Sequence, residues 1–190
     1  ADARRLLAQT LYAKRGTIYD RNGNVLTSSV ECRNIAVNPQ LIEDVDKTVS
    51  ALVKATGIDK KTCRELVESD GTWVYIKRQA DEDDATALEK KNLPGVLFEQ
   101  AMKRVYPYGN LASQVLGVVN VDNDGLTGLE KQYNKLLTGT NGSLVRERAR
   151  DGSYIAGGAY KKVAAVDGVD IVTTLDVNIQ RAAEDALAEA

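Results

Sequence analysis

The sequence predicts an α+β fold with a mixed or antiparallel sheet, β-hairpins and packed helices. Residues 17–27 place β-branched and apolar residues on both sides of Asn22-Gly23, a pair typical of a type I′ hairpin turn. Residues 39–57 carry apolar side chains at helical spacing, and residues 73–78 alternate between two faces as a strand does. Because helical and strand patterns follow one another along the chain, we expect helices packed on a sheet.

The composition is that of an ordinary globular protein. With 190 residues, of which 43% are hydrophobic and 27% charged, the chain can bury a core as one domain or as two small lobes. Its 25 basic residues are balanced by 27 acidic ones, and a net charge of −2 provides no basic field that would attract nucleic acid. The chain has no histidine and two cysteines, which excludes a Ser-His-Asp triad, a Cys-His pair and the usual zinc sites. We therefore expect no nucleic-acid partner, no metal and no cofactor.

The first residues predict an amphipathic helix. Leu6, Leu7, Thr10 and Leu11 recur at helical spacing, and no clear capping residue precedes them. The start does not resemble a signal peptide, and no run of 18 or more apolar residues occurs. We interpret residues 1–14 as the remnant of a longer helix.

The middle of the chain alternates between strands and helices. Pro39 suits a first helical turn, and Asp59 is expected to cap a second helix. The acidic run at 81–84 favours a solvated helix start over a metal cluster, because adjacent carboxylates point in different directions. In order, we expect a strand at 34–37, helices at 39–57 and 59–69, a strand at 73–78 inside the sheet, a helix from 81 and a strand from 96.

The last third predicts turns, short helices and a second hairpin. Asn120, Asp122 and Asp124 imitate a calcium loop, but the twelfth position is Lys131, so we interpret this stretch as a polar turn. In order, we expect a short helix capped by Asn110, a helix with Leu129, Tyr133, Leu136 and Leu137 inward, strands at 143–149 and 153–156 across Asp151-Gly152, a strand at 169–175, and a helix capped by Asp176 that carries Ile179, Ala183 and Leu187.

Three motifs carry more polar residues than their local structure needs. They are R-G-x-I-x-D-R-N-G-x-x-L at 15–26, R-x-Y-P-x-G with A-x-x-V-L-G at 104–117, and G-L-x-G-L-E-x-x-Y at 125–133. Taken alone, they would be a charged hairpin, a strand-to-helix corner, and a helix start whose glutamate offsets the helix dipole. The candidate site residues that they contain are Arg15, Gly16, Asp20, Arg21, Asn22, Gly23, Arg104, Tyr106, Pro107, Gly109, Gly128, Glu130 and Tyr133.

In this order, the motifs resemble the N-terminal pedestal, or dimerisation, domain of class B penicillin-binding proteins. Residues 167–187, D-G-x-D-I-x-x-T-L-D-x-x-I-Q-x-x-A-E-x-A-L, resemble the segment that leads from this domain to a transpeptidase domain. The resemblance implies an elongated pedestal with two lobes, an anchor and a head. The implied boundaries are a juxtamembrane helix remnant at 1–14, a pedestal at 15–175 with a head insertion at 38–103, and the start of a link at 176–190.

The resemblance implies a non-catalytic role. The motifs S-x-x-K, S-x-N and K-T-G, which form the active site of penicillin-binding enzymes, are all absent from the sequence. The chain would position a transpeptidase domain for peptidoglycan cross-linking at the extracytoplasmic face of a bacterial membrane, where an N-terminal transmembrane helix would anchor the parent. Implied partners are that domain, cell-wall synthesis membrane proteins such as a SEDS-type glycosyltransferase, and a second copy of the chain. The alternative is a free-standing secreted protein-binding module.

The resemblance also implies an ionic contact inside the pedestal. Glu130 would be a buried partner for Arg15, Arg21 or Arg104, and we expect Asp20 to lie with them. Removing one member of such a cluster would leave a buried charge unpaired, at a cost of several kcal/mol.

The two cysteines, Cys32 and Cys63, have two interpretations. They are either a reduced, buried pair or, in the extracytoplasmic compartment that the resemblance implies, a disulfide. A bridge closing about 30 residues would stabilise the fold by about 3–4 kcal/mol.

Overall fold

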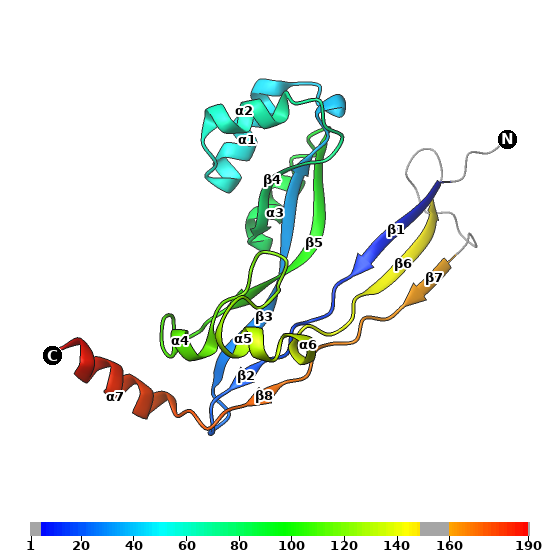
Figure 1. Cartoon of the computed structure of the whole chain (residues 1–190). Coiled ribbons are helices and arrows are strands. Elements are labelled where there is room, and N and C mark those ends of the chain that lie inside the picture. Colours follow the sequence, from blue (N-terminus) through cyan, green and yellow to red (C-terminus); the bar gives the residue numbers. More distant parts are fainter. Residues whose placement is uncertain (1–4, 149–159, 190) are drawn as a thin grey trace. The chain divides into compact units, whose positions relative to one another are not determined.

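Figure 1 shows the computed structural model, which describes residues 5–148 and 160–189. The chain divides into two compact units, the first made of residues 1–29 with 104–190 and the second of residues 30–103. The predicted α+β fold is confirmed, because each unit combines helices with paired strands. The predicted head insertion falls within the second unit.

The first unit contains a three-stranded antiparallel sheet in the order β1, β6, β7. The predicted helix at 1–14 is wrong for residues 5–11, which form strand β1. Their apolar spacing suits a helix, but pairing with a strand far along the chain decides the conformation. The strands are β1 (Arg5–Leu11), β6 (Gly142–Arg148) and β7 (Tyr160–Val163).

Part of the predicted second hairpin is present in this sheet. Strand β6 covers most of the predicted strand at 143–149, and the strand that follows it in the sequence and pairs with it is β7. The predicted strand at 153–156 and the predicted turn at Asp151-Gly152 lie outside the described residues.

The predicted first hairpin is confirmed, although its turn type is wrong. β2 (Ile18–Tyr19) pairs antiparallel with the start of β3 (Val25–Val37), and parallel with β8 (Ile171–Val172). In the turn, φ is positive at Gly23 (84°) and not at Asn22. A type I′ turn needs positive φ at both central residues. A single left-handed glycine is typical of a hairpin with a β-bulge, and the pairing of β2 with β3 does shift its register between Ile18 and Tyr19.

The helices of the first unit are shorter than predicted. They are α4 (Ser113–Leu116), α5 (Gly128–Gln132), α6 (Asn134–Leu137) and α7 (Val177–Ala188). The predicted helix after residue 125 breaks between α5 and α6, where the Asn134 side chain accepts a hydrogen bond from the Gly125 N–H (2.9 Å). Leu137 is buried as predicted, but Tyr133 is 36% and Leu136 53% exposed, so the prediction that these two point inward is wrong.

The predicted caps of these helices have different outcomes. Ala112, with φ of 54°, precedes α4, so the predicted cap by Asn110 is wrong. Asp176 caps α7 as predicted, accepting hydrogen bonds from the N–H groups of Asn178 (3.0 Å) and Ile179 (3.3 Å). The core of the unit is made of Ile18, Leu26, Leu111, Ala112, Leu116, Leu137 and Val177.

The second unit packs helices against strands. β3 pairs with both β4 (Val74–Ala80) and β5 (Val96–Val105). Among the described strands β4 pairs with β3 alone, which places it at an edge of the sheet. The prediction that residues 73–78 lie inside the sheet is wrong, since aromatic and β-branched composition indicates a strand but not its place in a sheet. The helices are α1 (Val45–Thr56), α2 (Lys60–Val67) and α3 (Glu82–Glu89), after a short 3₁₀ turn at Pro39–Leu41.

Helix boundaries in the second unit follow from capping. Asp44 caps α1 through the Lys47 N–H (2.9 Å), so the helix begins six residues later than predicted and Pro39 starts the separate 3₁₀ turn. Asp59 caps α2 as predicted, through the Thr62 N–H (3.0 Å). The carboxylates at the start of α3 are exposed, as predicted. Ile35, Val37, Val49, Leu52, Cys63 and Leu88 are among the buried residues of the core.

Both cysteines are buried and free. The interpretation as reduced thiols is therefore confirmed, and the disulfide is wrong. Burial raises the pKa of the Cys32 thiol to about 11 and also raises that of Cys63, so both stay protonated and unreactive near neutral pH.

Candidate functional site

A buried glutamate held by two arginines is the main polar feature of the first unit. The Glu130 carboxylate accepts a hydrogen bond from Arg15 Nε at Oε2 (2.6 Å) and one from Arg104 Nε at Oε1 (2.7 Å). The three side chains are between 0% and 2% exposed. We call Arg15, Arg104 and Glu130 the buried cluster. It joins the segment before β2, the end of β5 and helix α5.

Every nitrogen of the Arg15 guanidinium has at least one hydrogen-bond acceptor. Its Nη2 donates to the Glu130 carbonyl oxygen (2.8 Å). Its Nη1 lies within hydrogen-bond distance of Asn123 O (2.9 Å), Asn134 Oδ1 (2.7 Å) and Thr138 Oγ1 (2.8 Å). A planar donor fork of this kind fixes orientation as well as charge. Arg15 therefore connects the N-terminal segment to the loop before α5 and to α6.

The second arginine is less completely satisfied. Arg104 Nη1 donates to the Arg15 carbonyl oxygen (3.2 Å) and to Ser29 Oγ (3.2 Å), whereas Nη2 has no hydrogen-bond partner among the described residues. Burial lowers the pKa of Arg104, and the Glu130 carboxylate opposes this shift. Burial also raises the pKa of the Tyr106 hydroxyl, with the negative charge of Glu130 adding to the effect.

Two of the motif glycines permit close approach of the backbone around the cluster. A Cβ on Gly16 would lie 2.0 Å from the Val169 carbonyl oxygen. Gly128 has φ of 56°, and a Cβ there would lie 2.5 Å from the Val115 carbonyl oxygen. Any side chain at either position would force the backbone apart and so displace Arg15 or Glu130.

Asp20 forms a second buried polar site, which joins the hairpin turn to α7. Its carboxylate accepts hydrogen bonds from the N–H groups of Asn22 (2.8 Å) and Asn24 (2.8 Å), from Asn24 Nδ2 (2.9 Å) and from the Val177 N–H (3.2 Å). Burial alone would raise the pKa of Asp20, but these donors outweigh it and lower the pKa to about 2.

Two neighbouring contacts strengthen the same junction. The Arg21 N–H donates to the Leu175 carbonyl oxygen (2.8 Å), and Asn22 Nδ2 donates to Asp176 Oδ2 (2.9 Å). The hairpin turn therefore holds the residues that lead into α7 at several points. We call these contacts, together with those of Asp20, the hairpin–α7 junction.

The expected convergence of five charged residues is only partly correct. The structure brings together Arg15, Arg104 and Glu130, and Glu130 is the predicted ionic partner of both arginines. Asp20 is buried but bonds to the hairpin–α7 junction instead, and Arg21 is exposed, so the prediction is wrong for these two. Arg21 contributes to the turn through its main-chain N–H, which donates to the Leu175 carbonyl oxygen, while its side chain is exposed.

The remaining motif residues shape turns rather than bind charge. Tyr106 packs against the apolar core, and its carbonyl oxygen accepts the Gly109 N–H (2.9 Å) across exposed Pro107. Tyr133 lies exposed at the break between α5 and α6.

Sequence reasoning missed the neutral residues around the buried cluster. Asn134 and Thr138 both accept from Arg15, and Ser29 accepts from Arg104. Asn134 directly follows the third motif, but an asparagine at the end of a predicted helix is usually an ordinary surface residue. The signal that could have found it is the requirement that a buried guanidinium satisfy all its donors.

The cluster is built to hold segments together, not to perform chemistry. Side chains that are 0–2% exposed cannot reach a substrate, and both oxygens of the Glu130 carboxylate already accept hydrogen bonds from the arginines. Among the described residues, no group of carboxylates and thiols could hold a metal ion. No helix in the described ranges has the length and apolar character needed to cross a bilayer.

Comparison with known protein families agrees with this arrangement. The sequence-family model for the penicillin-binding protein dimerisation domain matches residues 10–173, which include all three motifs. The chain belongs to the penicillin-binding protein dimerisation domain family. Its buried cluster and hairpin–α7 junction are therefore features of one such domain.

Curated relatives and solved structures support the same family. Over its whole length the chain is 32% identical to the probable peptidoglycan D,D-transpeptidase PenA of Neisseria meningitidis and covers 33% of that protein. It is 33% identical to the peptidoglycan D,D-transpeptidase FtsI of Escherichia coli, over 81% of the chain and 27% of FtsI. The crystal structure of penicillin-binding protein 2X from Streptococcus thermophilus matches 96% of the chain and 31% of that protein, at 30% identity and a TM-score of 0.62. The chain thus spans about a third of the length of these relatives or less.

Proposed function

We propose that this chain is the non-catalytic pedestal of a class B penicillin-binding protein and positions a peptidoglycan D,D-transpeptidase domain for cell-wall cross-linking. Family membership, the length of the relatives and the names of PenA and FtsI support this role. The absence of S-x-x-K, S-x-N and K-T-G supports a division of labour in which acylation belongs to another part of the parent protein.

One observation carries the positioning role. The buried Asp20 carboxylate accepts the Val177 N–H at the start of α7, and Arg21 and Asn22 hold the two preceding residues. Residues 176–190 are where we propose that the link to the transpeptidase domain begins. A turn that holds the first residues of this link from several directions would transmit the orientation of the pedestal to whatever follows α7.

The proposal extends to domain limits, location and partners. We assign the pedestal to residues 15–175, with its head at 38–103, and the parent to the extracytoplasmic face of a bacterial membrane, anchored by a transmembrane helix ahead of this chain. The pedestal would also contact cell-wall synthesis membrane proteins, among them a SEDS-type glycosyltransferase, and self-association is part of the same proposal.

Fluorescent penicillin tests the division of labour. The full-length parent should be labelled covalently, while the 190-residue chain stays unlabelled at the same concentration, because none of its serines has a lysine three residues on. Stoichiometric labelling of this chain, lost on replacing one of its serines, would make the chain an enzyme and overturn the proposal.

A parent carrying Asp20→Asn tests the positioning role. In purified form it should still be labelled by penicillin, since the active site is elsewhere, but it should support less cross-linking in cells that depend on it. The matched control is Asp185→Asn, because Asp185 is exposed on α7 and outside the junction. Equal cross-linking by the two variants would contradict the role assigned to the hairpin–α7 junction.

A further inference from the structure

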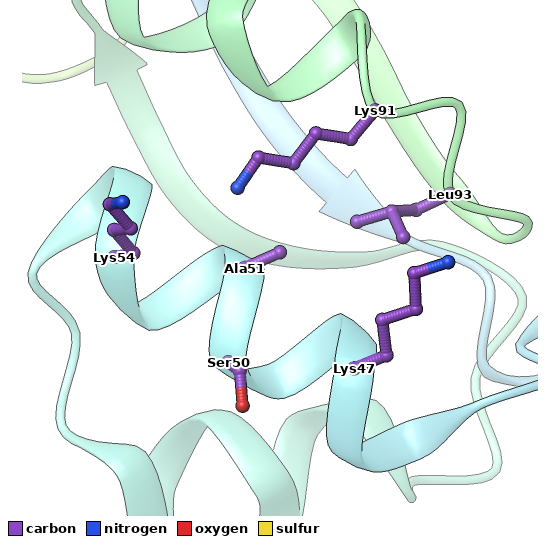
Figure 2. Close-up of a pocket in the computed structure, with 6 residues that line it drawn as sticks. All are labelled: Lys47, Ser50, Ala51, Lys54, Lys91 and Leu93. Atoms are coloured by element: carbon purple, nitrogen blue, oxygen red, sulfur yellow. The ribbon is translucent and has the colours of Figure 1, made fainter.

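A pocket in the second unit is lined by three lysines and no carboxylate. Its volume is about 490 Å³, and its lining residues are Lys47, Ser50, Ala51, Lys54, Lys91 and Leu93. Figure 2 shows Ala51 and Leu93 pointing toward each other across the pocket, with the three lysine side chains around them. Ala51 and Leu93 are 7% and 8% exposed and form an apolar floor under a basic rim. We call it the lysine pocket.

The chain fold places the lysines side by side. Lys47, Ala51 and Lys54 lie on one face of α1, since spacings of four and three residues fall on the same side of a helix. Lys91 comes from the connection between α3 and β5. Residues from two separate segments thus converge on one pocket.

The three ammonium groups are uncommitted. All three lysines are exposed, and none forms an ion pair in the part of the chain that the structure describes. Nearby carboxylates are engaged elsewhere, since Asp46 pairs with Arg64 and Glu89 pairs with Arg33. In a chain with a net charge of −2, general basicity does not account for this positive site.

The geometry selects among anionic ligands. Seven residues of helix separate the Cα atoms of Lys47 and Lys54 by about 10 Å, and Lys91 comes from another segment. A ligand with several anionic groups spaced along its length can pair with all three lysines while their flexible side chains stay apart. The apolar floor adds a second requirement, because a polyphosphate has nothing to bury against Ala51 and Leu93. An acidic peptide with an apolar side chain between its carboxylates meets both requirements.

We propose that the lysine pocket binds an acidic segment of a partner protein, with an apolar side chain on the pocket floor and carboxylates on the lysines. This inference deepens the contact role in the proposed function and rests on it. Binding to the 190-residue chain is nevertheless measured without the parent enzyme, so the labelling and cross-linking experiments can succeed or fail independently.

Fluorescence anisotropy with a synthetic peptide tests the site. The probe is a fluorescein-labelled peptide in which one leucine is flanked on each side by two glutamates and a glycine-serine tail. The triple variant Lys47→Gln, Lys54→Gln and Lys91→Gln should bind it about tenfold more weakly, as expected from the loss of three exposed ion pairs. The folded state is not at risk, because these side chains are on the surface.

The controls separate a specific site from general charge. Lys61→Gln, Lys131→Gln and Lys135→Gln remove the same charge from exposed positions outside the pocket and should leave binding unchanged. Replacing the probe's leucine by serine should weaken binding to the unmodified chain. Equal weakening by both triple variants, or no binding at all, would overturn the proposal. Displacement by inorganic polyphosphate together with indifference to the leucine would instead assign the pocket to a phosphate polymer.

Discussion

Each of the two units contains a cluster of three charged residues, and the two clusters have opposite charge composition. In the first unit one glutamate, Glu130, lies between two arginines, and all three side chains are at most 2% exposed. In the second unit one arginine, Arg33, lies between Glu82 and Glu89, whose side chains are 50% and 54% exposed. Distances are the same in both, at 2.6–2.7 Å. The number and length of the contacts do not distinguish the clusters, but burial does.

Burial changes what an ion pair contributes. Water solvates the two glutamates around Arg33 whether or not they are paired, so each exposed pair contributes little. The side chains of the buried cluster are at most 2% exposed, so breaking the cluster leaves a charge that is neither paired nor accessible to solvent. We therefore expect large effects of substitution at Glu130 and small ones around Arg33.

Glu130→Gln should produce the largest effect. It leaves two buried guanidinium groups with a neutral amide, and the free energy of unfolding should fall by about 3–5 kcal/mol. This free energy is measured by urea denaturation, with far-ultraviolet circular dichroism as the probe of unfolding. Glu65→Gln is the control, because Glu65 is exposed on α2 and has no ion pair with any residue that the structure describes, and it should be within about 0.5 kcal/mol of the unmodified chain. A similar loss for both variants would show that burial is not the deciding factor.

Arg104→Lys should have an intermediate effect. Lysine keeps the charge near Glu130, but one ammonium group cannot also reach Arg15 O and Ser29 Oγ as the guanidinium does. We expect a loss of about 1–3 kcal/mol in the free energy of unfolding, measured in the same way. A variant as stable as the unmodified chain would mean that charge alone, without the donor fork, holds the cluster.

Asp20→Asn should make stability less dependent on pH. The pKa of Asp20 is lowered in the folded state, from 3.8 to about 2, so the ionised group stabilises the fold above pH 4. That stabilisation is lost as pH falls from 4 to 2. The unfolding temperature of the variant should thus lie below that of the unmodified chain at pH 7, and the gap should narrow toward pH 2. A gap that is constant across this range would show that ionisation of Asp20 is not what matters.

Glu89→Gln should have the smallest effect. It breaks one exposed pair and leaves Arg33 bonded to Glu82, so the free energy of unfolding should change by no more than about 1 kcal/mol. The change should shrink further in 1 M salt, where exposed charges are screened. A loss as large as that of Glu130→Gln would remove the contrast between the clusters.

Local sequence signals predicted several helix boundaries and turns of this fold. Asp59 and Asp176 were predicted as caps because a side-chain acceptor beside a helix start acts over a few residues. The hairpin at Asn22-Gly23 is likewise a local feature, because the backbone preferences of two adjacent residues indicate the turn. The conformation of residues 5–11 depends instead on a distant segment. They form strand β1 because they pair with β6, and nothing in the sequence near either strand indicates that pairing. The helix break at Asn134 likewise depends on a hydrogen bond from Gly125 that helical spacing does not reveal.

The candidate site was predictable in its charges but not in its geometry. A glutamate and arginines in ordered motifs predicted a buried ionic contact, yet nothing in the sequence distinguished buried Arg15 from exposed Arg21. The partners of Arg15 come from positions more than a hundred residues away, and they settle which arginine is desolvated. The lysine pocket had no sequence signal, because Lys91 joins Lys47 and Lys54 only in the folded unit.

Paired double-mutant cycles test the contrast most directly. One cycle combines Arg15→Met with Glu130→Leu, and the other combines Arg33→Met with Glu89→Leu, each with its single variants. The coupling free energy from urea denaturation should be about 2–3 kcal/mol in the buried cycle and about 0–1 kcal/mol in the exposed one. Equal coupling in the two cycles, or a larger value around Arg33, would contradict the claim that burial, and not the number or length of the contacts, decides how strongly an ion cluster stabilises the fold.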